Sequence, residues 1–75
     1  MEYKTKDFYE ASALLASKLK LLNLEQESKF YWFVFDDFVE CSRVSNLFWG
    51  NELSVLAKDY ADAIRTLKDR LFARG

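Results

Sequence analysis

Phe30-Tyr31-Trp32-Phe33-Val34-Phe35 is an almost unbroken aromatic run in the middle of the chain. A polar segment, residues 26–29, precedes it, and an acidic pair, Asp36-Asp37, follows it. Aromatic and β-branched residues favour strands, and a short apolar run bounded by turn signals is typical of a strand buried on both faces. Because side chains alternate along a strand, the run has two faces. We expect one face to carry Tyr31, Phe33 and Phe35, and the other to carry Phe30, Trp32 and Val34.

The chain has 75 residues, which suits one domain near the lower size limit for unaided folding. Seven Phe, four Tyr and two Trp exclude a disordered chain. A core of this size supplies only about 3–5 kcal/mol, and small domains add disulfides, metals or self-association. The chain has one cysteine, Cys41, and no His, so neither an internal disulfide nor a zinc site is expected. Of these three sources of added stability, self-association is therefore the one that remains.

The charges are nearly balanced, with 11 basic and 12 acidic residues and a net charge of −1. Nucleic-acid-binding domains are usually clearly basic, so this balance argues against such a function. The N-terminal residues 1–7 are charged and lack the apolar stretch of a signal peptide. The longest apolar runs are far shorter than a membrane span, so we expect a cytoplasmic location and no membrane partner.

Helical and strand patterns surround the aromatic run. Thr5 is placed to cap a first helix, whose apolar stripe runs from Phe8 to Leu19 and which should fade between Ser17 and Leu19. Residues 21–25 alternate between apolar and polar and predict a half-buried strand. A turn at residues 27–28 would then pair this strand with the aromatic one in an antiparallel hairpin.

Two further helices are predicted after the hairpin. Asp37 followed by Glu40 is the pattern of a capping box, and Gly50 stands where a left-handed C-terminal cap is expected. The stripe of this second helix comprises Phe38, Cys41, Val44, Ser45, Phe48 and Trp49. Residues 53–56 indicate a short third strand or an extended connector, and a last helix begins near Lys58. The predicted fold class is α+β, in the order helix, strand, strand, helix, short strand, helix, with the first and last helices packed on one face of a small antiparallel sheet.

Catalytic chemistry has little support in the sequence. Without His, acid–base catalysis would need carboxylates, Lys or Tyr with shifted pKa values. Asp36-Asp37 is an adjacent pair, but neighbours on a strand point to opposite faces, and Asp37 is better used as a helix cap. Cys41 lies in an apolar stripe without an activating base, so it is interpreted as a packing residue. No calcium loop or phosphate-binding glycine loop is present, and we expect no enzyme activity, cofactor or metal.

Nucleic-acid binding is the alternative function. Aromatic strands can stack on bases, but they then accompany a basic groove, whereas acidic residues surround this hairpin. Charges along the last helix alternate in sign through Lys58, Asp62, Arg65 and Asp69 and so neutralise one another. A basic patch would have to assemble after folding, in a dimer, from Lys18, Lys20, Lys68, Arg70 and Arg74.

Three stretches carry a resemblance to a known family: Thr5-Lys6-Asp7-Phe8-Tyr9, Phe33-Val34-Phe35-Asp36, and residues 60–68 with a Tyr-x-x-Ala-x-Arg-x-Leu-Lys pattern. With the Phe48-Trp49 pair, they resemble a small domain family of unknown function found in bacteria, archaea and their viruses. The resemblance covers nearly the whole chain. It implies a stand-alone domain, suggests an origin in a virus or mobile element, and supplies no catalytic residues.

The expected function is a non-enzymatic protein-interaction module that self-associates. Large exposed apolar patches are rare on soluble monomers, and a two-fold dimer hides the same patch on both chains. We expect a dimer at micromolar concentration with Trp32 at or beside the contact, although a different protein partner stays open. The candidate interface residues are Phe30, Trp32, Val34, Leu47 and Phe72.

Overall fold

The structure, a computed structural model, describes residues 1–74 of the chain, and the side chains of residues 1–73. Its elements follow the order β1 (Tyr3–Thr5), α1 (Phe8–Ala16), β2 (Leu21–Glu27), β3 (Phe30–Phe35), α2 (Phe38–Trp49) and α3 (Ala57–Arg74). The strands form one antiparallel sheet in the order β1-β3-β2. The α+β class predicted from the sequence is therefore confirmed.

The aromatic run is the central strand, with the bounds expected from the sequence. Phe33 lies between Thr5 of β1 and Leu24 of β2 in the sheet register. β2 and β3 are joined by a two-residue turn at Ser28-Lys29, one position later than predicted, and Ser28 adopts a φ of 55°. The hairpin prediction is confirmed in all but the position of its turn.

The third strand comes from a different part of the chain than predicted. Residues 3–5 form β1, whereas residues 53–56 are extended but belong to no strand. The alternation at 53–56 is real, because residues 53 and 55 are half-buried and 54 and 56 are exposed. Since Thr5 belongs to β1, the cap of α1 is Asp7, whose side chain accepts a hydrogen bond from the Glu10 amide. The predicted order of the helices and the hairpin is thus confirmed, while the source of the third strand and the Thr5 cap are corrected.

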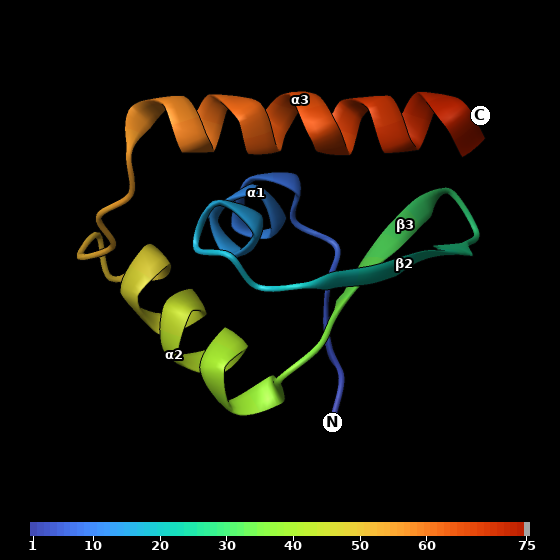
Figure 1. Cartoon of the computed structure of the whole chain (residues 1–75). Helices are drawn as coiled ribbons and strands as arrows, with labels where there is room; N and C mark the ends of the chain where they lie inside the picture. Colours follow the sequence, from blue (N-terminus) through green and yellow to red (C-terminus); the bar gives the residue numbers. More distant parts are fainter. Residues whose placement is uncertain (75) are drawn as a thin grey trace.

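The three helices gather on one side of the sheet around α1 (Figure 1). Phe33 and Phe35 of β3 contribute to one buried cluster with all three helices and with β2. Its members are Ala11, Leu14, Leu24, Phe33, Phe35, Cys41, Val44 and Leu67. α3 lies along α1 and reaches the core through Leu67, so the last helix covers the first helix more than the sheet.

Helices α1 and α2 both end in a left-handed residue other than glycine. Asn51 has a φ of 61° and donates its amide to the Phe48 carbonyl, while the Glu52 amide bonds the Leu47 carbonyl at 2.8 Å. These two bonds form a Schellman motif with Asn51 in the left-handed position, because Asn tolerates that region better than most residues. Gly50 itself has a φ of −84°, so the prediction of a left-handed Gly50 is wrong by one residue.

A buried carboxylate joins β1 to α1. Glu10 is 5% exposed, and it accepts hydrogen bonds from the Tyr3 hydroxyl at 2.6 Å and the Thr5 hydroxyl at 2.7 Å. Burial, followed by the bond to Glu10, raises the pKa of Tyr3. Burying a charge is costly unless it is hydrogen-bonded, and these two hydroxyls meet that requirement. The contact fixes a strand too short to hold its place by ladder bonds alone.

Candidate protein-interaction surface

The sheet face that turns away from the helices is largely covered within the chain. Val34 and Trp32 lie on it, and Lys4 of β1 pairs with Val34 while Glu25 of β2 pairs with Trp32. The Lys4 ammonium lies 3.0 Å from the Glu25 carboxylate, so an ion pair between the outer strands crosses the central one. Val34 is 0% exposed. The expectation that Val34 contributes to an interface is therefore corrected.

The two aromatic residues of this face also have partners in the same chain. The Trp32 indole N–H donates to the Glu27 carboxylate at 2.8 Å, and the rings of Phe30 and Trp32 meet edge to face with centroids 5.4 Å apart. The Lys6 ammonium lies 5.0 Å from the centroid of the Phe30 ring, within range of a cation–π interaction. Phe30 and Trp32 are half-buried, so this face offers a partner less apolar surface than the sequence suggests.

The sheet edges are poor sites for strand pairing. The outer strand β2 has an irregular register between Leu21 and Asn23 and carries Glu25 and Glu27. β1 is only three residues long. Bulges, charges and short edge strands are the features by which proteins prevent edge-to-edge association. Neither edge is therefore a good candidate for the interaction surface.

The remaining candidates from the sequence lie on helices. Leu47 of α2 is half-buried. Phe72 is 79% exposed near the C-terminal end of α3, far from α2 in Figure 1. The two side chains belong to different parts of the molecule, and the structure does not bring them together with the sheet face.

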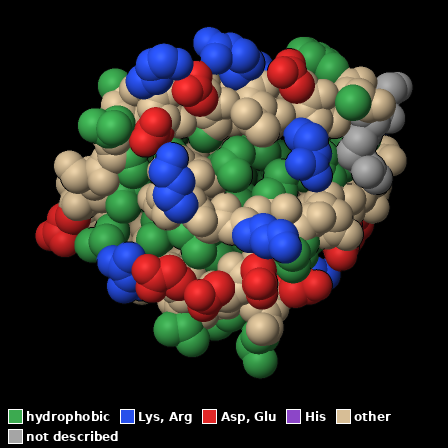
Figure 2. Space-filling model, in the orientation of Figure 1, with side chains coloured by type: hydrophobic (Ala, Val, Ile, Leu, Met, Phe, Trp, Pro, Cys, Tyr) green, Lys and Arg blue, Asp and Glu red, His purple; other side chains and the backbone are tan. Residues whose placement is uncertain are grey.

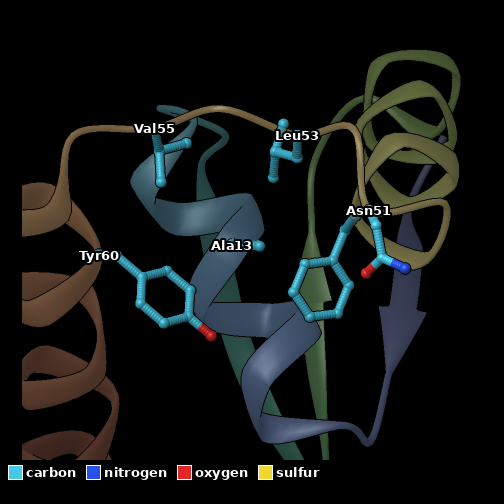
Figure 3. Close-up of a pocket in the computed structure, with 6 residues that line it drawn as sticks. Ala13, Asn51, Leu53, Val55 and Tyr60 are labelled. Carbon is cyan, nitrogen blue, oxygen red and sulfur yellow. The ribbon is translucent and has the colours of Figure 1, made fainter.

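A pocket of about 320 Å³ lies where the end of α2, the connector to α3 and the start of α3 meet α1. Its surface is about as polar as it is apolar: it is lined by Ala13, Phe48, Asn51, Leu53, Val55 and Tyr60. In Figure 3, Val55 and Leu53 descend from the connector, Tyr60 comes from α3, and Ala13 presents only a methyl group from α1. The small size of Ala13 leaves the space between the aromatic walls unfilled.

Three exposed residues with large apolar side chains adjoin residues that line this pocket. Tyr9 is 60% exposed, and its carbonyl accepts a hydrogen bond from the Tyr60 hydroxyl at 3.3 Å. Trp49 is 58% exposed, and its ring meets that of Phe48 at 5.0 Å. Leu56, at 72% exposed, follows Val55 directly. We define the pocket with Tyr9, Trp49 and Leu56 as the α2–α3 surface.

The sequence contained only part of the signal for this surface. The sequence placed Phe48 and Trp49 together on one stripe of the second helix, but it did not indicate that their exposure would differ. Phe48 is half-buried in the pocket wall, whereas Trp49 is the last residue of α2 and is exposed. Exposure at a helix end depends on where the chain turns next, and the Asn51 turn sets this direction.

A second group of exposed apolar residues surrounds the start of α2. Met1, Phe38 and Val39 are 92%, 43% and 78% exposed, and the Met1 carbonyl accepts a bond from the Phe38 amide at 2.9 Å. The ring of Phe38 lies 5.7 Å from that of Tyr3. None of these three residues lines the pocket of the α2–α3 surface.

The basic residues of the alternative function are exposed but do not form a patch of one sign. Lys18 lies 3.6 Å from Asp59, and Lys58 and Arg65 both bond Asp62. Basic and acidic side chains intermingle over the face in Figure 2. Lys20, Lys68 and Arg70 are exposed, and the side chain of Arg74 lies outside the described residues.

The side chains that could take part in catalysis are used in packing and helix capping. The Cys41 thiol is buried and donates to the Asp36 carbonyl at 3.2 Å, and burial, followed by Asp37 and Asp36, raises its pKa to about 11. A protonated thiol is a weak nucleophile. Asp37 caps α2 by accepting from the Glu40 amide, while Glu40 bonds Arg43 rather than returning to Asp37, so the capping box is half formed. Among the described residues, no cluster of three or more Cys, Asp or Glu is placed to hold a metal ion.

Comparison of the chain with models of protein families, with curated proteins and with solved structures finds no match. The helices within residues 1–74 include none with both the length and the apolar character needed to cross a membrane.

Proposed function

We propose that this domain is a non-enzymatic protein-interaction module that forms a homodimer through the α2–α3 surface and acts in the cytoplasm. The observation that carries the proposal is the grouping of Tyr9, Trp49 and Leu56, each more than half exposed, beside a pocket with two aromatic walls. Aromatic residues around a concave apolar site are typical of the energetic centre of protein interfaces. The resemblance to a family found in viruses supports an origin in a virus or mobile element as part of the same proposal.

A second copy of the chain is the partner that the charges and size favour. The net charge of −1 gives little repulsion between copies, and domains near zero net charge associate readily. A standard interface buries about 800 Å² per partner, which is about one-sixth of the 5037 Å² surface of this chain. A two-fold dimer uses the same surface on both chains, so one patch suffices for both sides. Association would also add stability to a small core.

The oligomeric state of the unmodified protein tests the proposal. Light scattering coupled to chromatography and sedimentation velocity, from low micromolar to near-millimolar concentration, should show a monomer–dimer equilibrium. A monodisperse monomer over the whole range would overturn the proposal.

Three lysine substitutions locate the contact. Trp49→Lys should yield a monomer with the far-UV spectrum of the parent protein, because it places a charge on the α2–α3 surface. Phe72→Lys is a matched control, since Phe72 is more exposed than Trp49 and lies at the opposite end of α3, and it should remain dimeric. Trp32→Lys tests the sheet face. A monomeric Trp32 variant beside a dimeric Trp49 variant would assign the contact to the sheet and reject the α2–α3 surface.

A further inference from the structure

We infer that the pocket of the α2–α3 surface is a tryptophan-binding site, which receives the Trp49 indole of a second copy while its own Trp49 enters the pocket of that copy. The inference rests on the proposed homodimer and specifies which side chain each pocket takes. It does not follow from dimerisation alone, because a dimer formed through the sheet face would leave both pockets empty.

The pocket has the lining that an indole ring requires. Its aromatic walls, Phe48 and Tyr60, and its aliphatic wall, Leu53 and Val55, offer apolar contact on several sides. Aromatic rings gain from edge-to-face contact with other rings beyond the burial of area. Ala13 at the back keeps about 320 Å³ open, at the lower end of the range for sites that bind small molecules.

The polar groups of pocket and side chain also match. Indole carries one polar group, an N–H that only donates, and it usually finds an acceptor when buried. Within residues 1–74, the side chains of Asn51 and Trp49 have no hydrogen-bond partner. The Asn51 amide at the mouth of the pocket provides a carbonyl acceptor (Figure 3). The Tyr60 hydroxyl, in contrast, already donates a hydrogen bond to the Tyr9 carbonyl.

The other tryptophan does not fit the same role. The N–H of Trp32 already bonds Glu27, its ring packs on Phe30, and its side chain is half-buried. Both tryptophan rings meet a phenylalanine edge to face, but only Trp49 is more than half exposed. Because Phe48 forms a pocket wall and also contacts Trp49, the inserted side chain and the receiving pocket are neighbours, which allows two reciprocal insertions about one two-fold axis.

A mixing experiment tests the insertion directly. Trp49→Ala removes the inserted side chain and keeps the pocket, whereas Val55→Trp fills the pocket and keeps Trp49. Val55 lies outside the buried cluster, so this change should leave the fold intact, which far-UV circular dichroism checks. Each variant alone should dimerise roughly 1,000-fold more weakly than the parent, because a symmetric dimer loses both insertions and each hot spot accounts for roughly 30-fold. An equimolar mixture should recover part of the affinity, because the Val55→Trp chain can insert its Trp49 into the open pocket of the other.

Asn51→Gly tests the hydrogen bond without disturbing the turn. Glycine accepts the left-handed conformation of residue 51, so the substitution removes only the side-chain acceptor. Dimer affinity should fall by roughly 4- to 100-fold, because the symmetric dimer loses two hydrogen bonds and each accounts for roughly 2- to 10-fold. In protein labelled with 5-fluorotryptophan, the ¹⁹F signal of Trp49 should shift on dilution and that of Trp32 should not.

The outcomes separate this inference from the proposed function. A dimer whose affinity is unchanged by Trp49→Ala, or a mixture without recovery, would overturn the insertion and leave the homodimer standing. A shift of the Trp32 signal in place of Trp49 would do the same. A monomeric parent protein would overturn the proposed function itself. Recovery in the mixture, together with the Trp49 shift, would establish the pocket as the site of insertion.

Discussion

The Lys4 ammonium and the Glu25 carboxylate lie 3.0 Å apart, although they belong to the two outer strands of the sheet. The ion pair crosses β3 beside Val34, which is 0% exposed even though the helices pack on the opposite face. Both charged groups are nearly half exposed, at 46% and 41%, so the charge–charge attraction is weak. We expect the larger effect to come from the aliphatic stem of Lys4, because such stems cover apolar surface. Together with the Trp32–Glu27 and Lys6–Phe30 contacts, this pair explains why the second aromatic face need not be an interface.

Replacing Lys4 separates the two effects. Lys4→Met keeps an unbranched apolar stem and should unfold at nearly the same urea concentration as the parent. Lys4→Ala removes the stem beside Val34 and should unfold at a lower urea concentration than either the parent or Lys4→Met. Equal losses in the two variants would mean that the charge, not the stem, protects this face.

The comparison of sequence and structure shows where local patterns suffice. The central strand and α3 were predictable because apolar periodicity extends over many residues. β1 was not, because three residues carry too little pattern, and its place depends on the distant contacts of Tyr3 and Thr5 with Glu10. Residues 53–56 show strand-like alternation but contact the pocket and core on the far side of α1, where no strand edge is available to pair with them.

The candidate site was less predictable than the fold for a related reason. The aromatic composition of the sheet face was visible in the sequence, but its cover comes from cross-strand partners such as Glu27 and Lys6, which depend on register. The pocket depends on Ala13, a small residue whose significance appears only once α1 lies between the ends of α2 and α3.

Phe33 should be the most sensitive position of the aromatic strand. It is 3% exposed and packs in the central cluster, with the ring of Phe8 6.2 Å away. Phe33→Ala should cost about 3–5 kcal/mol, which is most of the stability expected of a domain this small. Circular dichroism at room temperature should show a largely unfolded chain. Trp32→Ala is the control and should cost less, because Trp32 is half-buried; a Phe33 loss below about 1 kcal/mol would contradict the assignment of faces.

Glu10 should hold β1 in the sheet. Glu10→Ala leaves the hydroxyls of Tyr3 and Thr5 without their acceptor and should cost about 2–3 kcal/mol, the range for hydrogen bonds to charged groups. Hydrogen exchange at residues 3–5 should accelerate more than exchange at residues 30–35. Glu10→Gln keeps one carbonyl oxygen and should lose less. Uniform acceleration over both strands would mean that Glu10 supports the whole core rather than β1.

Asp37 should act as a cap and nothing more. Asp37→Ala removes the acceptor for the Glu40 amide and should cost about 0.5–2 kcal/mol. Asp37 also has a φ of 73°, a region that Asn tolerates and Ala does not, so Asp37→Asn should be nearly neutral in thermal unfolding. A large loss in the Asn variant would show that the carboxylate charge has a role beyond capping.

Cys41 should make stability fall in alkaline solution. Burial, followed by Asp37 and Asp36, raises the pKa of its thiol from 9.0 to about 11 in the folded chain. A raised pKa means that the folded state holds the proton more tightly, so the full contribution is present below pH 9 and is lost as the pH rises through about 11. The loss across this window should be on the order of 2–3 kcal/mol, at 1.36 kcal/mol per pKa unit.

Cys41→Ala is the control for this prediction. The quantity to compare is how steeply the free energy of unfolding changes with pH, not its value at one pH. Cys41→Ala will unfold more easily at every pH, because it removes a fully buried side chain. Tyr3 and Lys4 also have raised pKa values and will lower stability in the same range, but they do so in both proteins. Urea unfolding at pH 8 to 11 should therefore give a shallower decline for Cys41→Ala than for the parent chain. Parallel declines would show that the Cys41 thiol has the same pKa in the folded and unfolded states, so that burial does not raise it.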